Sequence, residues 1–136
     1  FYAIFYNMEG KSEYYYKNAL TLAYLGDAVF TLIVREKLIK TNENKPNALN
    51  KRANAIVCAR NQAEIMRSIQ NDLSEDELDI AMRARNSHLQ NRKAKHSTIE
   101  EYSLATQFEA LIGYWYLTKN QERLDSVMNE YVWSKL

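Results

Sequence analysis

The chain has 136 residues, of which only three are glycine and one is proline. Proteins on average contain about 12% of these two residues together, so there is little material here for tight hairpin turns or for a glycine-rich phosphate loop. This composition disfavours an all-β sandwich and a nucleotide-binding α/β domain, and it predicts a single all-α domain.

The net charge of +1 conceals an uneven distribution of charge. Between residues 80 and 99 there are five cationic residues, both histidines and no acidic residue, which leaves 13 basic and 17 acidic residues in the rest of the chain. A local charge of +5 therefore lies on a body of −4. Such a focused positive field favours an anionic partner, although charge-rich loops are often only solvated.

One cysteine, Cys58, excludes internal disulfides and a cysteine-rich zinc site, and it suits a reducing cytoplasm. Its apolar neighbours predict a buried structural thiol rather than a nucleophile. The longest apolar runs, 28–34 and 110–117, are shorter than the roughly 18 residues that span a bilayer. We therefore expect a cytoplasmic protein with no membrane partner.

Apolar spacing and helix breakers predict six helices. Gly26 is expected to end the first helix, and Pro46 to open the third. Ser74 and Glu77 form a capping-box pattern that opens the fourth. The predicted helices run from about Tyr14 to Leu25, Asp27 to Lys40, Pro46 to Ile69, Ser74 to Asn86, Ser97 to Leu117 and Asn120 to Val132.

Residues 13–136 are expected to form the domain, with residues 1–12 as an N-terminal tail. Met8 is a candidate natural start, so residues 1–7 carry no functional weight here.

Two acidic residues, Asp27 and Glu109, lie in apolar surroundings that do not suit a solvated charge. An ionised carboxylate among apolar side chains must be paired, hydrogen-bonded or bound to metal. Asp27 could instead be a helix N-cap after Gly26, and Glu109 could be a core acid paired with an arginine. Two carboxylates from different helices beside a basic surface are also what is needed to hold Mg²⁺ against a phosphate.

The basic stretch contains residue types suited to phosphate and 2′-hydroxyl contacts. The two histidines lack the helical spacing of a zinc pair, so a metal role for them is not expected. The candidate RNA-binding residues are Arg83, Arg85, Asn86, His88, Arg92, Lys93, Lys95 and His96.

Several segments together resemble a known family. The sequence from Leu25 to Val29 resembles the signature helix of the ribonuclease III family, and the sequence from Phe108 to Gly113 resembles its second acidic motif. The segments 45–49, 62–65 and 83–86 are similar to the corresponding parts of the short subclass called Mini-ribonuclease III.

The resemblance runs in order from about Ala19 to Met128. Longer members have further acids where this chain has Ala23 and Thr106, which supports the subclass and leaves the number of metal ions open. It implies an all-helical homodimer, without an appended RNA-binding domain, that cleaves double-stranded RNA. Asp27 and Glu109 would bind Mg²⁺, with Mn²⁺ able to substitute. The products would carry 5′-phosphate and 3′-hydroxyl ends, and precursor ribosomal RNA would be the substrate.

Two other functions remain open at this point. The domain could be a non-catalytic RNA-binding or ribosome-associated module that kept the fold. Alternatively, His88 and His96 could act as general acid and base in metal-independent RNA cleavage, which would leave a cyclic phosphate.

Overall fold

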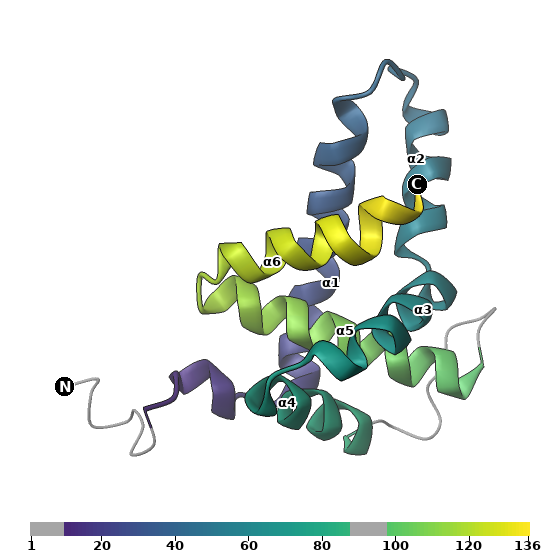
Figure 1. Ribbon diagram of the computed structural model, residues 1–136. Coiled ribbons are helices and arrows are strands. Elements are labelled where there is room, and N and C mark those ends of the chain that lie inside the picture. Colours follow the sequence, from purple (N-terminus) through teal and green to yellow (C-terminus); the bar gives the residue numbers. More distant parts are fainter. Residues whose placement is uncertain (1–9, 88–97) are drawn as a thin grey trace.

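Two long helices, α1 (Ala19–Ile39) and α5 (Ile99–Leu117), cross in the middle of the molecule, as Figure 1 shows. The computed structural model describes residues 10–87 and 98–136, and within these ranges it contains helices and no strand, so the all-α prediction is confirmed. None of the helices in the described ranges has the length and apolar character needed to cross a bilayer. The remaining helices are α2 (Pro46–Val57), α3 (Ala59–Ile69), α4 (Glu75–Asn86) and α6 (Gln121–Val127), with short 3₁₀ turns at Glu13–Tyr16, Gln70–Asp72 and Trp133–Lys135 and a π-helical turn at Met128–Val132.

The predicted helix boundary at Gly26 is wrong, because α1 runs through this glycine without a break. The helix begins after Asn18, whose side chain accepts hydrogen bonds from the main-chain N–H groups of Leu20 and Thr21. A glycine in a helix interior costs about 1 kcal/mol relative to alanine. Packing against α5 offsets that cost, because Gly26 lies where the two helices meet.

The crossing of α1 and α5 is a direct contact between backbones. A Cβ atom built on Gly26 would lie 1.7 Å from the carbonyl oxygen of Glu109, and one built on Gly113 would lie 2.1 Å from the carbonyl oxygen of Leu22. Real Cβ atoms do not approach oxygen this closely, so both positions require glycine. The ring of Phe30 packs edge-on against that of Phe108 at 5.2 Å next to this contact in the buried core.

The predicted third helix is two helices, because the chain turns at Cys58. This residue has extended backbone (φ −66°, ψ 154°) and separates α2, which packs on α1, from α3, which packs on α5. One straight helix could not lay apolar faces on both neighbours. The junction lies at the surface, so the prediction of a buried thiol is also wrong and Cys58 is exposed.

The buried carboxylate of Glu77 joins α4, α5 and α6. Glu77 completes the predicted capping box with Ser74 and also accepts hydrogen bonds from Trp115 Nε1 at 2.8 Å and from Arg123 Nε at 3.0 Å. Desolvation opposes ionisation of Glu77, but these donors outweigh it and hold its pKa below the usual value. The network ties α4, α5 and α6 together, and it thereby holds α5, which crosses α1, in place.

We expect Gly26→Ala to destabilise the protein, although alanine is the better helix former. The new methyl group would meet backbone atoms of α5, which cannot move aside as a flexible side chain can. Overpacking typically costs about 1 to 3 kcal/mol in the free energy of unfolding, and the backbone clash places this variant at the upper end of that range. Urea unfolding followed by circular dichroism measures the change. A variant as stable as the parent chain would contradict the close crossing.

Candidate active site

The helix crossing brings the two predicted carboxylates together. Asp27 follows Gly26 in α1, and Glu109 supplies the carbonyl that Gly26 contacts in α5. Asp27 is exposed and lies inside the helix, so it is not an N-cap. Glu109 is partly buried, and within the described structure its side chain interacts with Asp27 and Gln62 rather than with an arginine. The N-cap role considered for Asp27 is therefore wrong, and among the described residues Glu109 has no arginine partner.

The electrostatics of this carboxylate pair are unfavourable for two full negative charges. Burial raises the pKa of Glu109, and the charge of Asp27 and a hydrogen bond with it raise the pKa further, to about 8. The amide of Gln62 acts in the opposite direction by donating a hydrogen bond to Glu109 Oε2 at 3.3 Å. At neutral pH the pair consequently holds a proton, unless a cation takes the place of that proton.

The donor atoms at this pair fit a hard divalent cation. Mg²⁺ typically takes one or two protein carboxylates and completes its octahedral shell with water and phosphate oxygens. Within the described ranges, no cluster of three or more acidic, histidine or cysteine side chains is available to hold a metal. Ala23 and Thr106 are buried, and the hydroxyl of Thr106 donates to the carbonyl of Tyr102 at 2.9 Å. Asp27 and Glu109 are therefore the two candidate ligands.

Sequence reasoning missed one polar residue of the site, Gln62. It lies on the buried face of α3, in helical register with Ile65, Met66 and Ile69. The available signal was a glutamine at helical spacing among apolar residues, which indicates a buried amide that needs hydrogen-bond partners. The sequence alone does not identify those partners.

The predicted RNA-binding residues lie partly inside the described structure. The guanidinium of Arg83 is held by the molecule itself: it donates to the carbonyls of Tyr15 and Lys17 and lies 3.4 Å from the carboxylate of Asp79. Arg85 and Asn86, at the end of α4, are exposed. The other predicted RNA-binding residues, His88, Arg92, Lys93, Lys95 and His96, lie outside the described residues.

Comparison with known proteins defines the class to which this fold and site belong. The family model of the Ribonuclease III domain matches residues 20–120, which include both helices of the crossing and both carboxylates. The class is therefore that of the ribonuclease III-type endonucleases.

Individual relatives narrow this class. Mini-ribonuclease 3 of Brevibacillus brevis is 42% identical over 113 residues, which are 83% of this chain and 84% of that protein. Mini-ribonuclease 3 of Clostridium tetani is 40% identical over 112 residues, or 82% and 74% of the two chains. A crystal structure of a Fusobacterium nucleatum protein matches with a TM-score of 0.76 at 38% identity, covering 84% of this chain and 91% of the other. The chain belongs to the ribonuclease III family and, within it, to the Mini-ribonuclease 3 group. Membership of this family makes it an endoribonuclease.

The pair predicts that the metal-free protein loses stability as the pH rises. The pKa of Glu109 is raised from 4.5 to about 8 on folding, so the folded chain binds this proton more tightly than the unfolded chain does. The resulting stabilisation is complete below pH 4.5 and is lost as the pH rises toward 8. Glu109→Gln keeps a neutral side chain at every pH and should lack this component.

Thermal and urea unfolding in EDTA, from about pH 5 to pH 8, compare the two proteins. The stability of the variant relative to the parent should increase by roughly 2 to 4 kcal/mol over this range. Added Mg²⁺ should reduce the difference at pH 8 by binding to the parent chain. Parallel stability curves for the two proteins in EDTA would show that the carboxyl of Glu109 is not perturbed.

Proposed function

We propose that this protein is a Mg²⁺-dependent endoribonuclease that cleaves double-stranded RNA. The observation that carries the proposal is the contact between Asp27 and Glu109 at the glycine crossing, in a chain of the ribonuclease III family. Precursor ribosomal RNA is the proposed natural substrate, on the strength of the resemblance to Mini-ribonuclease III.

Asp27 and Glu109 would hold the cation, and Mn²⁺ would replace Mg²⁺ at the same oxygen ligands. When bound, the cation supplies a Lewis acid that lowers the pKa of water and neutralises charge that develops on the phosphate. Asp27 is exposed and can reach the substrate side of the pair, whereas Glu109 is anchored in the core by its helix. The products would carry a 5′-phosphate and a 3′-hydroxyl.

The RNA duplex would contact the basic region that begins at the end of α4. Arg85 and Asn86 are exposed there, and they lead directly into the stretch that contains Arg92, Lys93 and Lys95. Double-stranded RNA is recognised mainly by its A-form shape, through phosphate and 2′-hydroxyl contacts. Arg83 would act indirectly, because its contacts with Tyr15, Lys17 and Asp79 hold α4 against the N-terminal 3₁₀ turn.

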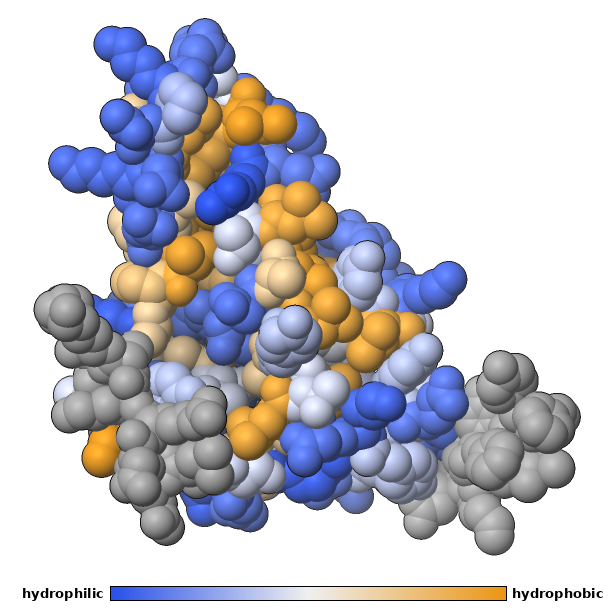
Figure 2. All heavy atoms as spheres, turned by 180° about the vertical axis from the view of Figure 1, so that it is seen from behind, coloured by the Kyte–Doolittle hydropathy of each residue, from blue (hydrophilic) through white to orange (hydrophobic). Residues whose placement is uncertain are grey.

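A second copy of the chain would pack on the outer face of α1. Tyr24, Leu32 and Ile39 lie on this face and are 82%, 56% and 64% exposed. The end of α1 and the helix α2 project from the rest of the molecule (Figure 1). Figure 2 shows hydrophobic side chains in a discontinuous band that runs from this projecting part into the rest of the molecule. Exposed apolar residues that repeat along one helix face are typical of an interface.

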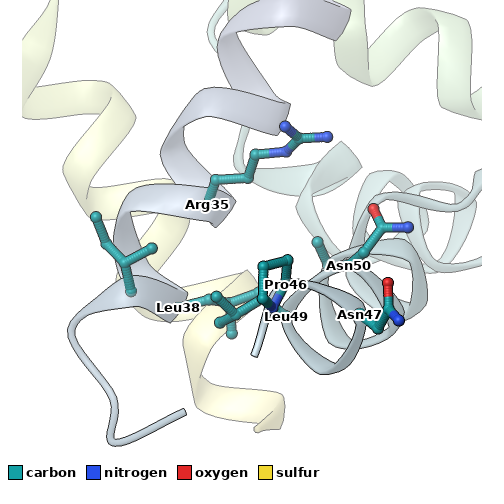
Figure 3. Close-up of a pocket in the computed structure, with 8 residues that line it drawn as sticks. Arg35, Leu38, Pro46, Asn47, Leu49 and Asn50 are labelled. Carbon is teal, nitrogen blue, oxygen red and sulfur yellow. The ribbon is translucent and has the colours of Figure 1, made fainter. Parts of the chain in front are cut away.

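A hollow between α1 and α2 continues the same face. Its volume is about 390 Å³, and it is lined by Leu38 and Ile39 of α1 and by Pro46, Leu49 and Ala53 of α2. Figure 3 shows the lining side chains Leu38, Pro46 and Leu49 grouped in this view, with Arg35 extending from α1 above them. Because Asp27 lies on the same helix, a twofold dimer through this surface would place two sites on one side of the assembly.

The central test of the function is Asp27→Asn. The amide keeps the size of the side chain but removes the charge, so we expect the fold and duplex binding to persist while Mg²⁺-dependent cleavage falls by at least about 100-fold, the scale on which such electrostatic groups act. Cleavage of a precursor ribosomal RNA stem and of an unrelated duplex, each with Mg²⁺ and with EDTA, gives the rates. Analysis of the product ends identifies the chemistry.

A triple variant, with Arg92, Lys93 and Lys95 replaced by alanine, provides the matched control. It should show the opposite pattern, with weaker duplex binding and a smaller dependence of binding on salt, because fewer phosphate contacts release fewer counterions. Full activity of Asp27→Asn would refute the assigned site. EDTA-resistant cleavage to a cyclic phosphate would point to His88 and His96, and binding without any cleavage by the parent chain would indicate a non-catalytic module.

The proposed dimer predicts the effect of a charge on α1. Leu32→Glu would place a carboxylate in the buried interface, where an unpaired charge costs several kcal/mol. Sedimentation equilibrium should show twice the 16.0 kDa chain mass for the parent and a shift toward 16.0 kDa for the variant. Leu78→Glu, at a 44% exposed leucine on α4, should leave the mass unchanged. Equal masses for all three proteins would rule out this face as the dimer interface.

A further inference from the structure

Gln62 connects three elements beside the carboxylate pair. Its side chain is almost fully buried, and its amide nitrogen donates to the carbonyl of Val57 at 2.8 Å and to Glu109 Oε2 at 3.3 Å. Val57 is the last residue of α2, Gln62 lies in the first turn of α3, and Glu109 belongs to α5. The glutamine therefore joins the α2–α3 turn to one of the two candidate ligands.

The orientation of this amide follows from its partners. A main-chain carbonyl and a carboxylate oxygen are both acceptors, so the NH₂ group must face them. The other amide atom, Oε1, is buried and accepts no hydrogen bond from any residue of the described ranges 10–87 and 98–136. An unpaired buried acceptor is costly, and in proteins an ordered water is a usual partner for such a group. The free oxygen lies on the same planar group that contacts Glu109.

A purely structural role leaves part of this arrangement unexplained. The end of α2 is already secured by Asn61, whose amide donates to the carbonyl of Ile56 at 2.7 Å. An apolar residue at position 62 would fill the core without leaving an unpaired oxygen. A glutamine at this position instead provides one donor for the carboxylate and one acceptor for a water.

We propose that Gln62 is a positioning residue of the metal site. Its Nε2 holds Glu109 in the orientation in which the carboxylate receives the cation, and its Oε1 accepts a hydrogen bond from a water at the site. The inference rests on the proposed function and deepens it. Ala23 and Thr106 supply no carboxylate to the site. The neutral amide of Gln62 instead fixes the orientation of a carboxylate that is already there. Ligating carboxylates are commonly oriented by such outer partners.

The test uses Gln62→Leu in the full chain and measures Mn²⁺ binding without RNA, by electron paramagnetic resonance of the free ion. Loss of an orienting partner typically weakens metal binding by about 10- to 100-fold, and we expect a loss in this range. The Mg²⁺ concentration for half-maximal duplex cleavage should rise by a similar factor. Saturating metal should restore most of the cleavage rate, which a misfolded protein would not show.

Gln107→Leu is the matched control. Gln107 is also a buried glutamine whose Oε1 has no hydrogen-bond partner in the described part of the chain, but its amide donates to the hydroxyl of Ser103 at 3.3 Å rather than to a carboxylate. This variant should bind Mn²⁺ as the parent does. If both leucine variants weaken binding equally, the effect comes from repacking of the core, and the assignment of Gln62 is wrong.

Nuclear magnetic resonance of the parent chain gives a second measurement that does not depend on a variant folding. Mg²⁺ should shift the side-chain amide signals of Gln62 and leave those of Gln107 in place. Mn²⁺ binding that is unchanged in a folded Gln62→Leu protein, or a Gln62 signal that does not respond while Mg²⁺ binds, would overturn the inference alone. A parent chain that binds neither ion would instead overturn the proposed function.

Discussion

The contact between the backbones of α1 and α5 is the constraint on which the rest of the structure depends. Helix axes usually remain 8–10 Å apart because side chains lie between them. Here Gly26 and Gly113 have no side chains, and each faces a carbonyl of the opposite helix. The approach fixes the relative position of the two helices without help from flexible groups. The other helices, α2, α3, α4 and α6, each pack on α1, on α5 or on both.

The same contact explains the chemistry of the site. Asp27 is one residue from the first glycine, and Glu109 is the residue whose carbonyl that glycine touches. Close backbones therefore bring two like charges together, and burial raises the pKa of Glu109 toward 8. Such a pair is unstable as two free carboxylates and is suited to a divalent cation. The electrostatic repulsion between Asp27 and Glu109 is thus a consequence of the helix crossing.

The sequence was sufficient to predict the fold class and to single out the two acidic residues that the structure brings into contact, because both depend on strong local signals. Helical spacing and the lack of glycine and proline predicted an all-α domain, and the acids stood out among apolar residues. The errors arose where tertiary contacts override local rules. Glycine often marks a helix end, but Gly26 lies in a helix interior. Cys58 was expected in the core, but it is exposed at the turn between two helices that pack on different partners.

Gln62 escaped prediction for a related reason. Its neighbours along α3 indicate only that it is buried, whereas its meaning comes from Glu109, which is 47 residues away in the chain. Arg83 shows the same limit, because its hydrogen bonds to the carbonyls of Tyr15 and Lys17 cannot be predicted from the basic stretch in which it lies. Pairing partners distant in sequence were the missing information in both cases.

The unbroken course of α1 has a consequence for the geometry of an assembly. An α-helix rises about 1.5 Å per residue, so Asp27 and the end of the helix at Ile39 are separated by a rigid rod of about 18 Å. In the proposed dimer, the distance between the two active sites depends on the length of α1 between Asp27 and the point at which the partner contacts the helix. Moving the point of contact by one helical turn would change the span between the cuts on the two strands, with no change to the carboxylates themselves.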